Sequence, residues 1–169
     1  AGLDDGLESN LRTFFEQDYD SFELLFAVRQ ETDPTVPVVR TLQGQYPNVP
    51  SQLLLVGEPP YPNAKVWSLH HMTEAARHDL LVMSDSDIRV TPGFLRTIAA
   101  EFQDPKLGVS TCPYRAVSGP SFWSTLEAVG MNTEFLSGVI VARMLEGMKF
   151  ALGPTTTSRR QVLSDIGGW

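Results

Sequence analysis

Short apolar runs alternate with amphipathic segments over the first two thirds of the chain. The runs, each typical of a buried strand, occupy residues 22–28, 52–57, 80–83 and 109–114. Between them, apolar residues recur three or four positions apart, which predicts helices around residues 7–15, 34–42, 66–77 and 92–102. This alternation predicts an α/β fold with an open, mostly parallel sheet flanked by helices, in which the run at 80–83 is a buried, central strand.

Two of the predicted helices begin beside an aspartate. Asp4 or Asp5 can cap the first helix, and Asp33 can cap the second with Pro34 in its first turn. Capping is one reading of Asp33, and a role in binding is the other.

The pattern changes after residue 114. Residues 121–133 can form a helix whose inward side chains are Phe122, Leu126 and Val129. Residues 136–145 are mostly apolar, but a bilayer-spanning helix takes about 20 residues. We predict that this segment is core, and the alternative is a surface that contacts lipid or another part of the protein. Residues 150–152 then predict a strand before Gly153-Pro154, followed by a polar loop and a short helix.

Composition narrows the possible partners. A length of 169 residues suits a single domain, which we assign to 1–169. Thirteen basic and twenty acidic residues give a net charge of −7, which argues against nucleic acid and against docking on anionic lipid by charge alone. Cys112 is the only cysteine, so no intrachain disulfide is possible. No apolar run approaches the length of a membrane span, so we expect this chain to be soluble.

The main candidate for chemistry is Asp85-Ser86-Asp87, directly after the run at 80–83. On an extended chain, the side chains of Asp85 and Asp87 leave the same face. Open α/β sheets bind ligands just outside the carboxyl ends of their strands. A hard divalent cation in a phosphate site is typically held by one or two carboxylates. The pattern favours a metal–diphosphate anchor, and the alternative is that the two aspartates merely cap a turn.

Three basic residues lie in or next to predicted loops, where they could contact a ligand. Lys65 follows the proline-rich loop after the strand at 52–57, where its charge can meet a phosphate or a nucleotide, or simply be solvated. Arg159 and Arg160 offer the same two readings. Histidine offers little, because no Cys or His partner lies at zinc-like spacing from His70, His71 or His78.

Several common catalytic motifs are absent. There is no G-x-S-x-G, no G-x-x-x-x-G-K-[ST] and no G-x-G-x-x-G after a strand, which disfavours serine hydrolases, P-loop enzymes and dinucleotide-binding Rossmann domains. A sheet that handles phosphate without glycine-rich loops needs another way to neutralise charge. A metal on Asp85 and Asp87 would supply it.

The order of short motifs resembles the ceramide glucosyltransferase family, glycosyltransferase family 21, which includes bacterial relatives associated with hopanoid lipids. The resemblance extends over essentially the whole chain. It rests on Phe14–Tyr19, Asp33-Pro34, Asn63–Val66, Asp85–Val90, Gly153-Pro154 and Gly167-Gly168.

This resemblance implies a GT-A fold that transfers a hexose, glucose above all, from a UDP-sugar to a lipid acceptor such as ceramide, with inversion at the anomeric carbon. Asp33 would lie near the nucleobase and Lys65 against the nucleotide. Asp85 and Asp87 would bind Mg²⁺ or Mn²⁺, with Asp85 also at the nucleotide sugar. Residues 1–114 would form the nucleotide-sugar-binding part and 115–169 an incomplete acceptor-side part.

The resemblance also implies missing pieces. The family has a strand before the segment that matches Ala1, and an aspartate general base with a Gln/Arg-x-x-Arg-Trp motif after the segment that matches Trp169. We therefore expect a fragment truncated at both ends, with no catalytic base of its own and little or no turnover. The full-length protein would be membrane-associated, through segments outside this fragment, with a cytoplasmic catalytic face.

Two other functions stay open. A nucleotidyltransferase also combines an α/β sheet with carboxylate-bound Mg²⁺, although it usually has a glycine-rich, basic loop after its first strand. A non-catalytic nucleotide-binding or interaction module would use Asp85 and Asp87 only as turn caps.

Overall fold

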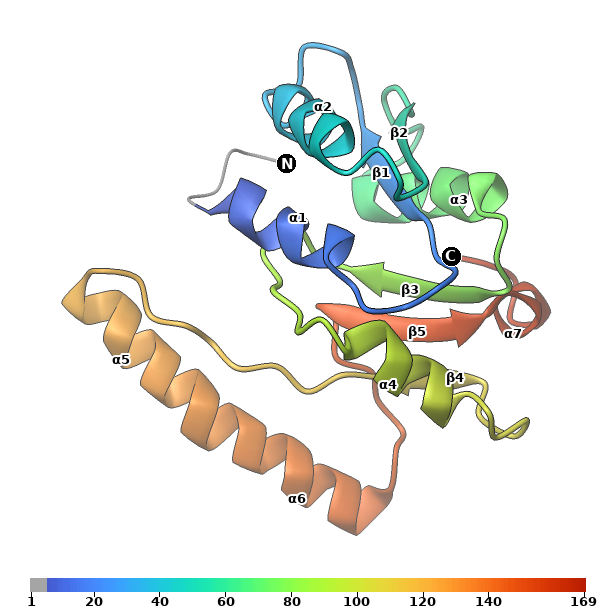
Figure 1. Cartoon of the computed structure of the whole chain (residues 1–169). Coiled ribbons are helices and arrows are strands. Elements are labelled where there is room, and N and C mark those ends of the chain that lie inside the picture. Colours follow the sequence, from blue (N-terminus) through green and yellow to red (C-terminus); the bar gives the residue numbers. More distant parts are fainter. Residues whose placement is uncertain (1–5) are drawn as a thin grey trace. The chain divides into compact units, whose positions relative to one another are not determined.

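The computed structural model describes residues 6–169, so the predicted cap at Asp4 or Asp5 lies outside the described residues. Figure 1 shows helices alternating with strands in chain order. The first part contains α1 (Leu7–Phe15), β1 (Leu24–Val28), α2 (Val36–Gln45), β2 (Ser51–Leu55), α3 (Ala64–Ala75), β3 (Leu80–Ser84), α4 (Phe94–Glu101) and β4 (Val109–Thr111). The chain continues through α5 (Phe122–Gly130), the π-helical turn η1 (Met131–Phe135), α6 (Leu136–Glu146), β5 (Thr155–Arg159) and α7 (Arg160–Asp165). The predicted helix–strand alternation is confirmed.

The described chain forms two compact units. Unit 1 comprises residues 1–109 and 157–169, and unit 2 comprises residues 110–156. The single-domain assignment, with its internal boundary at 114, stays a prediction. No helix in the described part of the chain is both long and apolar enough to cross a membrane.

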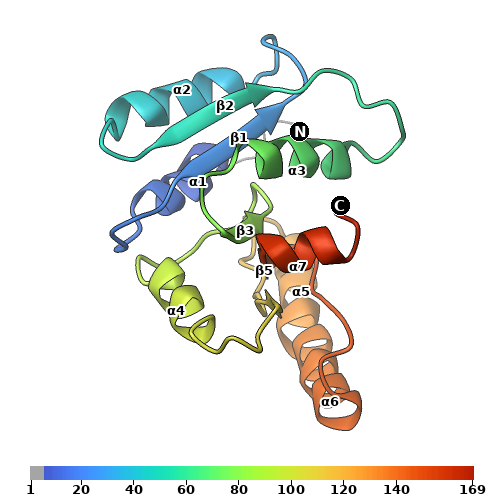
Figure 2. The same ribbon diagram turned by 90° about the vertical axis from the view of Figure 1, so that its right-hand side faces the viewer.

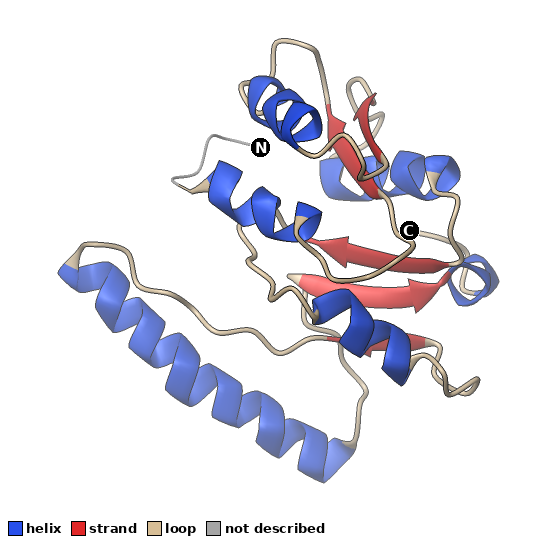
Figure 3. Ribbon diagram, in the orientation of Figure 1, coloured by secondary structure: helices blue, strands red, loops and turns tan. Residues whose placement is uncertain are grey.

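The strands are divided between two sheets. β1 and β2 are parallel, with Leu24 opposite Ser51 and Val28 opposite Leu55. β3, β5 and β4 form the other sheet in that order, and the arrows of β3 and β5 point in opposite directions (Figures 1 and 3). The prediction that the run at 80–83 is a buried, central strand is therefore wrong for the described chain. β3 is an edge strand, and its residues are only half-buried.

The core of unit 1 lies between α1, α2 and the β1–β2 pair. Figure 2 shows α2 and α3 on opposite sides of that pair. Phe15 of α1 stacks against Phe26 of β1 and Tyr46 beyond α2, with ring centroids 5.9 and 5.3 Å apart. The apolar stripe of α1 is buried here because residues spaced by three or four positions share one helix face. Leu42 is completely buried in the same cluster.

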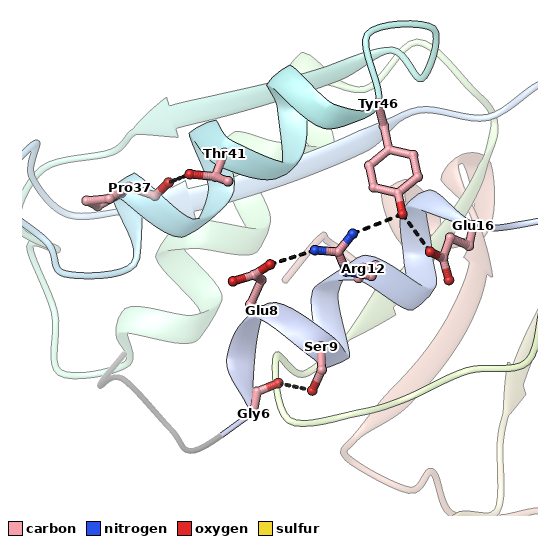
Figure 4. Close-up of polar contacts among 8 residues, drawn as sticks. All are labelled: Gly6, Glu8, Ser9, Arg12, Glu16, Pro37, Thr41 and Tyr46. Atoms are coloured by element: carbon pink, nitrogen blue, oxygen red, sulfur yellow. Dashed lines mark hydrogen bonds and ion pairs between the residues drawn. The ribbon is translucent and has the colours of Figure 1, made fainter.

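Polar contacts at the rim of this core fix α1 against the end of α2. The Arg12 guanidinium donates to the Tyr46 hydroxyl at 3.3 Å and to Glu8 at 2.6 Å (Figure 4). The Tyr46 hydroxyl donates in turn to Glu16 at 2.5 Å. Glu8 and Glu16 are exposed, and Arg12 and Tyr46 are half-buried, so these contacts define the orientation of α1 more than they stabilise it.

Two local predictions near the strand ends need correction. The second helix begins at Val36, with Thr35 at its N-cap and Pro37 in its first turn. Asp33 and Pro34, predicted as the cap and the first turn, lie in the turn before the helix. The third helix begins at Ala64, earlier than predicted, because the Asn63 side chain accepts a hydrogen bond from the Val66 N–H and caps it.

The last strand lies after the Gly-Pro turn, where a polar loop was predicted. β5 consists of Thr155-Thr156-Thr157-Ser158-Arg159, and Thr155, Thr157 and Ser158 are buried. Threonine is β-branched and fits a pleated strand, although its hydroxyl makes the segment look polar in sequence. The prediction of a strand at 150–152 is wrong.

Unit 2 is built around the continuous helical segment α5–η1–α6. The ring of Phe135 packs on that of Tyr114, with centroids 5.5 Å apart. The Asn132 side chain both accepts from the N–H of Ala116 and donates to its carbonyl oxygen.

The two predictions of buried apolar residues in this segment are wrong. Phe122, Leu126 and Val129 are exposed, and in 136–145 the exposed fractions reach 80% for Leu145. A helical segment forms at 121–133 as predicted and continues into α6, but much of its apolar surface is exposed in the described structure.

Candidate functional site

The two aspartates of the candidate anchor lie in a turn at the end of β3. The Ile88 N–H donates to the Asp85 carbonyl oxygen at 3.3 Å, so residues 85–88 form a turn. The expectation of two side chains on one face of an extended chain therefore does not hold as stated. Asp87 is exposed, and its carboxylate makes no hydrogen bond or ion pair in the described part of the chain.

Lys65 meets this turn from a different element. It lies in the first turn of α3, and its Nζ is 2.6 Å from Oδ1 of Asp85. Both side chains are partly exposed, at 48% and 38%. The structure thus brings together two of the predicted site residues that are twenty positions apart in sequence. The Asp85 carboxylate therefore faces the ammonium group of Lys65.

Asp33 is held by its own turn. Its Oδ1 accepts hydrogen bonds from the Thr35 N–H at 2.9 Å and the Thr35 hydroxyl at 2.7 Å. Burial by itself would raise the pKa of the Asp33 carboxyl, but these two hydrogen bonds outweigh it and leave that pKa below its ordinary value. Asp33 is therefore ionised at neutral pH. It contacts neither Asp85 nor Lys65 through any hydrogen bond or ion pair in the described structure.

A polar face of α1 braces the segment that carries the aspartates. Asn10, only 6% exposed, donates from Nδ2 to the Ser86 carbonyl oxygen at 3.5 Å and accepts from Arg89 Nε at 2.6 Å. Thr13 Oγ1 accepts from the Val90 N–H, and the Gln17 amide bonds both the Thr91 carbonyl oxygen and the Leu95 N–H. One side of α1 thus packs in the core, while Asn10 and Thr13 on its polar side, with Gln17 just after its end, hold the main chain from 86 to 95.

Sequence reasoning missed this brace. Asn10 and Thr13 are three residues apart in α1, which is the spacing of a shared helical face, and Gln17 follows two residues after the helix ends. The partners lie more than seventy residues away, so spacing alone does not identify them.

Arg159 and Arg160 bond the main chain instead of presenting their charge to a ligand. Arg159 donates to the carbonyl oxygens of Phe102, Asp104 and Leu107, and Arg160 to those of Thr73, Ala76 and His78. These carbonyls lie at and beyond the C-terminal ends of α4 and α3, where helical acceptors lack intrahelical partners and cations are favoured. The phosphate-binding reading of the two arginines is not supported by these contacts.

The donor set at the β3 turn suits a hard divalent cation in part. Asp85 and Asp87 supply carboxylate oxygens at an accessible position, as Mg²⁺ or Mn²⁺ requires. Within residues 6–169, no group of three or more His, Cys, Asp or Glu side chains is arranged to hold a metal. A cation here would take its remaining ligands from phosphate oxygens and water, which is the usual arrangement for Mg²⁺ with a nucleotide.

Comparison with known sequences gives matches over the whole chain. The family model described as glycosyl transferase family 21 matches residues 1–169. Ceramide glucosyltransferase 1 of Caenorhabditis elegans is 32% identical over 170 residues, covering 99% of this chain and 36% of the relative. A ceramide glucosyltransferase of Komagataella phaffii is 32% identical over 123 residues, covering 70% of this chain and 24% of the relative. The chain thus spans about a third or less of these curated relatives.

One solved structure supports the fold. A mannosyltransferase from Pyrobaculum calidifontis, solved in complex with GDP-Man and Mn²⁺, superposes with a TM-score of 0.73 and 20% sequence identity. The match covers 100% of this chain and 45% of the mannosyltransferase. The predicted GT-A-like α/β fold is confirmed.

Proposed function

The chain belongs to glycosyl transferase family 21, and on this premise we propose that it forms the nucleotide-sugar-binding part of a metal-dependent, inverting enzyme. The donor is a UDP-hexose, UDP-glucose in the first instance, and the acceptor is a lipid such as ceramide. The observation that carries the proposal is the Asp85–Lys65 contact at the end of β3, beside the exposed Asp87. The relatives named ceramide glucosyltransferases support the choice of sugar and lipid.

In this proposal, Asp85 and Asp87 hold Mg²⁺ or Mn²⁺ at the rim of the sheet. The bound cation would neutralise the diphosphate and stabilise the charge that develops on the departing UDP. The main-chain brace from Asn10 and Arg89 fixes the direction in which the turn presents its carboxylates.

Lys65 is the residue that changes partner when donor binds. Without donor, its ammonium group neutralises Asp85. Its flexible stem would let the same group reach a phosphate oxygen of the donor, so that Asp85 could hold a divalent cation. Asp33, which stays ionised because of its bonds to Thr35, would accept hydrogen bonds from the nucleobase or ribose side of the donor.

The acceptor half of the reaction needs a base to remove the proton of the attacking hydroxyl. We propose that this base and the lipid site belong to other parts of the full-length protein, which is membrane-associated through segments outside residues 1–169. The chain by itself would then bind donor and transfer little or no sugar.

Calorimetric titration of the purified full-length protein with UDP-glucose, with and without Mn²⁺, tests the proposal. We expect Mn²⁺-dependent binding that weakens at least a hundredfold in a variant carrying both Asp85→Asn and Asp87→Asn, because both charged ligands are lost. Asp20→Asn is the matched control, since Asp20 is an exposed aspartate of unit 1 outside the β3 turn.

Two competing ligands and the response to Mn²⁺ sharpen the result. Preference for GDP-mannose would contradict the proposed donor while leaving a sugar transferase in place. Preference for a free nucleoside triphosphate would indicate a nucleotidyltransferase. Binding that ignores both Mn²⁺ and the double substitution would show that Asp85 and Asp87 only cap the turn.

A further inference from the structure

An exposed stripe of side chains runs along the helical segment α5–η1–α6 of unit 2. Its members recur three or four positions apart, so they share one side of the helix: Phe122, Leu126, Val129, Thr133, Ser137, Val141 and Leu145. Steps of four residues drift around an α-helix, which has about 3.6 residues per turn, and the wider turn of η1 offsets this drift. Ile140 and Met144, which are also exposed, widen the stripe on α6. An apolar surface of this extent marks a site of interaction.

The charged side chains of this segment lie outside the stripe. The exposed charged residues of 122–146 are Glu127, Glu134, Arg143 and Glu146. Arg143, two residues before Leu145, lies on nearly the opposite side of α6. Three acidic side chains and one basic side chain give the segment no positive patch for an acidic partner. Apolar contact, and not charge, must therefore hold whatever binds the stripe.

The stripe also offers few directional groups to a partner. Its hydroxyl side chains are those of Thr133 and Ser137, and Thr133 Oγ1 already donates to the Val129 carbonyl oxygen at 2.7 Å. The main chain of a helix is satisfied internally. A protein–protein interface of standard size carries about ten hydrogen bonds. Hydrocarbon requires none, so the stripe suits lipid better than another protein surface.

Aromatic side chains stand at one end of the segment. Phe122 and Trp123 are 73% and 75% exposed, and their rings meet edge to face with centroids 5.5 Å apart. Tryptophan is enriched where a bilayer meets water, because its ring is apolar and its N–H is polar. At about 1.5 Å per residue, residues 122–146 span roughly 37 Å, a length typical of helices that lie in the plane of that interface.

We propose that this stripe docks on a bilayer of zwitterionic phospholipid, with the helical segment in the membrane plane and its apolar side chains at the acyl boundary. The inference rests on the proposed function, in which the acceptor is a lipid, and it assigns membrane contact to residues of this chain itself. Burial of apolar surface drives docking of this kind, so anionic lipid is not needed. The net charge of −7 agrees with this, because a negatively charged bilayer surface attracts basic segments. The contact would hold the chain within reach of an acceptor embedded in the membrane.

Site-specific photo-crosslinking of the full-length protein in phosphatidylcholine nanodiscs tests the proposal. The photoreactive residue p-benzoylphenylalanine replaces Leu145, which is 80% exposed in the stripe, or Arg143, the matched control on the other side of the same helix. After irradiation, we expect phospholipid adducts at position 145 to exceed those at position 143 about tenfold, because only the stripe faces the acyl chains. Adding phosphatidylserine or high salt should leave the yield at position 145 unchanged.

A pair of substitutions provides a second measurement. Val141→Glu, one turn before Leu145, should lower the lipid yield at position 145 about tenfold, because it places a charge in the stripe. Glu134→Gln, outside the stripe, should leave that yield unchanged. Both replaced side chains are exposed, so neither substitution disturbs a buried contact.

Other products would overturn the proposal. Cross-links from position 145 to a peptide of the same molecule would show that the protein itself covers the stripe. Cross-links between heavy-isotope and light copies, mixed before reconstitution, would assign the stripe to a second copy. Equal lipid labelling at positions 143 and 145, or labelling that requires phosphatidylserine, would rule out docking by apolar contact.

Titration of the same nanodiscs with UDP-glucose and Mn²⁺ separates this inference from the proposed function. Donor binding without lipid adducts at position 145 would overturn the docking surface alone. Lipid adducts at position 145 without donor binding would overturn the proposed function and leave the docking surface in place.

Discussion

The two units of this protein bury their apolar residues to very different extents. Unit 1 has a closed cluster of fully buried side chains from α1 and α2, including Phe15, Val39 and Leu42. In unit 2, the large hydrophobic side chains of α5 and α6 are mainly exposed, and Ala128 and Leu152 are its buried apolar residues. Apolar residues recur at helical spacing in both units. The difference shows that periodicity predicts a helix with an apolar face, but does not predict what covers that face.

The uncovered surfaces of the two units also differ in kind. The cavity in unit 1 is bordered by β1 and β3, which each have an edge without a strand partner in the described part of the chain, so main-chain groups as well as apolar side chains surround it. The α5–α6 surface exposes side chains only, because a helix satisfies its own main chain. The main-chain groups of an open sheet edge therefore limit which kind of partner can bind there, whereas a bare helix face sets no such limit.

The largest effect should be the difference between truncating a buried leucine of unit 1 and truncating an exposed leucine of unit 2. Leu42→Ala in unit 1 should lower the free energy of unfolding by about 2–5 kcal/mol, because it removes apolar contacts and leaves a cavity. Leu145→Ala in unit 2, where the side chain is 80% exposed, should change it by less than about 0.5 kcal/mol. Urea unfolding of the purified variants measures both. Equal losses would show that the α6 surface is covered in solution.

A smaller loss should follow from replacing the arginines that bond helix-end carbonyls. Arg160→Lys keeps the charge but cannot reach the three carbonyl oxygens that the guanidinium now satisfies, so we expect a loss of about 2 kcal/mol in unfolding free energy. Arg143→Lys, at an exposed position of α6, is the control and should be neutral. Thermal unfolding at several denaturant concentrations would reveal the difference. An unchanged Arg160→Lys protein would mean that water satisfies those carbonyls equally well.

The brace on the β3 turn can be tested with a matched pair of asparagines. Asn10→Ala removes the contacts to Ser86 and Arg89, and we expect Mn²⁺-dependent donor affinity to fall about tenfold, as is typical when the partners that support a metal ligand are lost. Asn132→Ala removes a comparable main-chain contact in unit 2 and should leave that affinity unchanged. Titration calorimetry at a temperature where both variants are folded measures this. If Asn10→Ala bound the donor as tightly as Asn132→Ala and the parent protein, α1 would have no role in positioning the site.

The smallest effect concerns acid stability. Glu23, whose side chain is 5% exposed, accepts hydrogen bonds from the N–H and Nε of Arg77. Burial would raise the pKa of Glu23, but the hydrogen bonds and charge of Arg77 outweigh it, so this pKa lies below its ordinary value.

A carboxyl with a depressed folded-state pKa stabilises the fold above its unfolded pKa, and this stabilisation is lost as the pH falls through the folded pKa. The melting temperature should therefore drop between pH 5 and pH 3, and the drop should be shallower in Glu23→Gln. Glu127→Gln, on exposed α5, should follow the parent protein. Identical profiles for Glu23→Gln and the parent would contradict the role of the Glu23–Arg77 pair.

Much of unit 1 follows from local sequence signals. The spacing of Leu7, Leu11 and Phe15 predicts α1, and the apolar run before Asp85 predicts β3, because side-chain periodicity reflects which face of an element is apolar. β5 was missed because its threonines are polar in composition yet β-branched in shape. Of the candidate site residues, Asp85 and Lys65 contact each other in the structure, whereas the contacts of Asn10 with the β3 turn were not foreseen.

The sequence by itself determined the helix–strand order, the family and the position of Asp85 and Asp87 at a strand end, since these depend on residues close together in the chain. Only the tertiary structure decided that Arg159 and Arg160 serve main-chain carbonyls and that α1 supports the β3 turn. It also decided that β1 and β3 border a cavity of about 490 Å³, whereas many large apolar side chains of α5 and α6 are exposed. The physical reason is that burial and hydrogen-bond partners are fixed by contacts between distant segments, to which local spacing contributes only the choice of face.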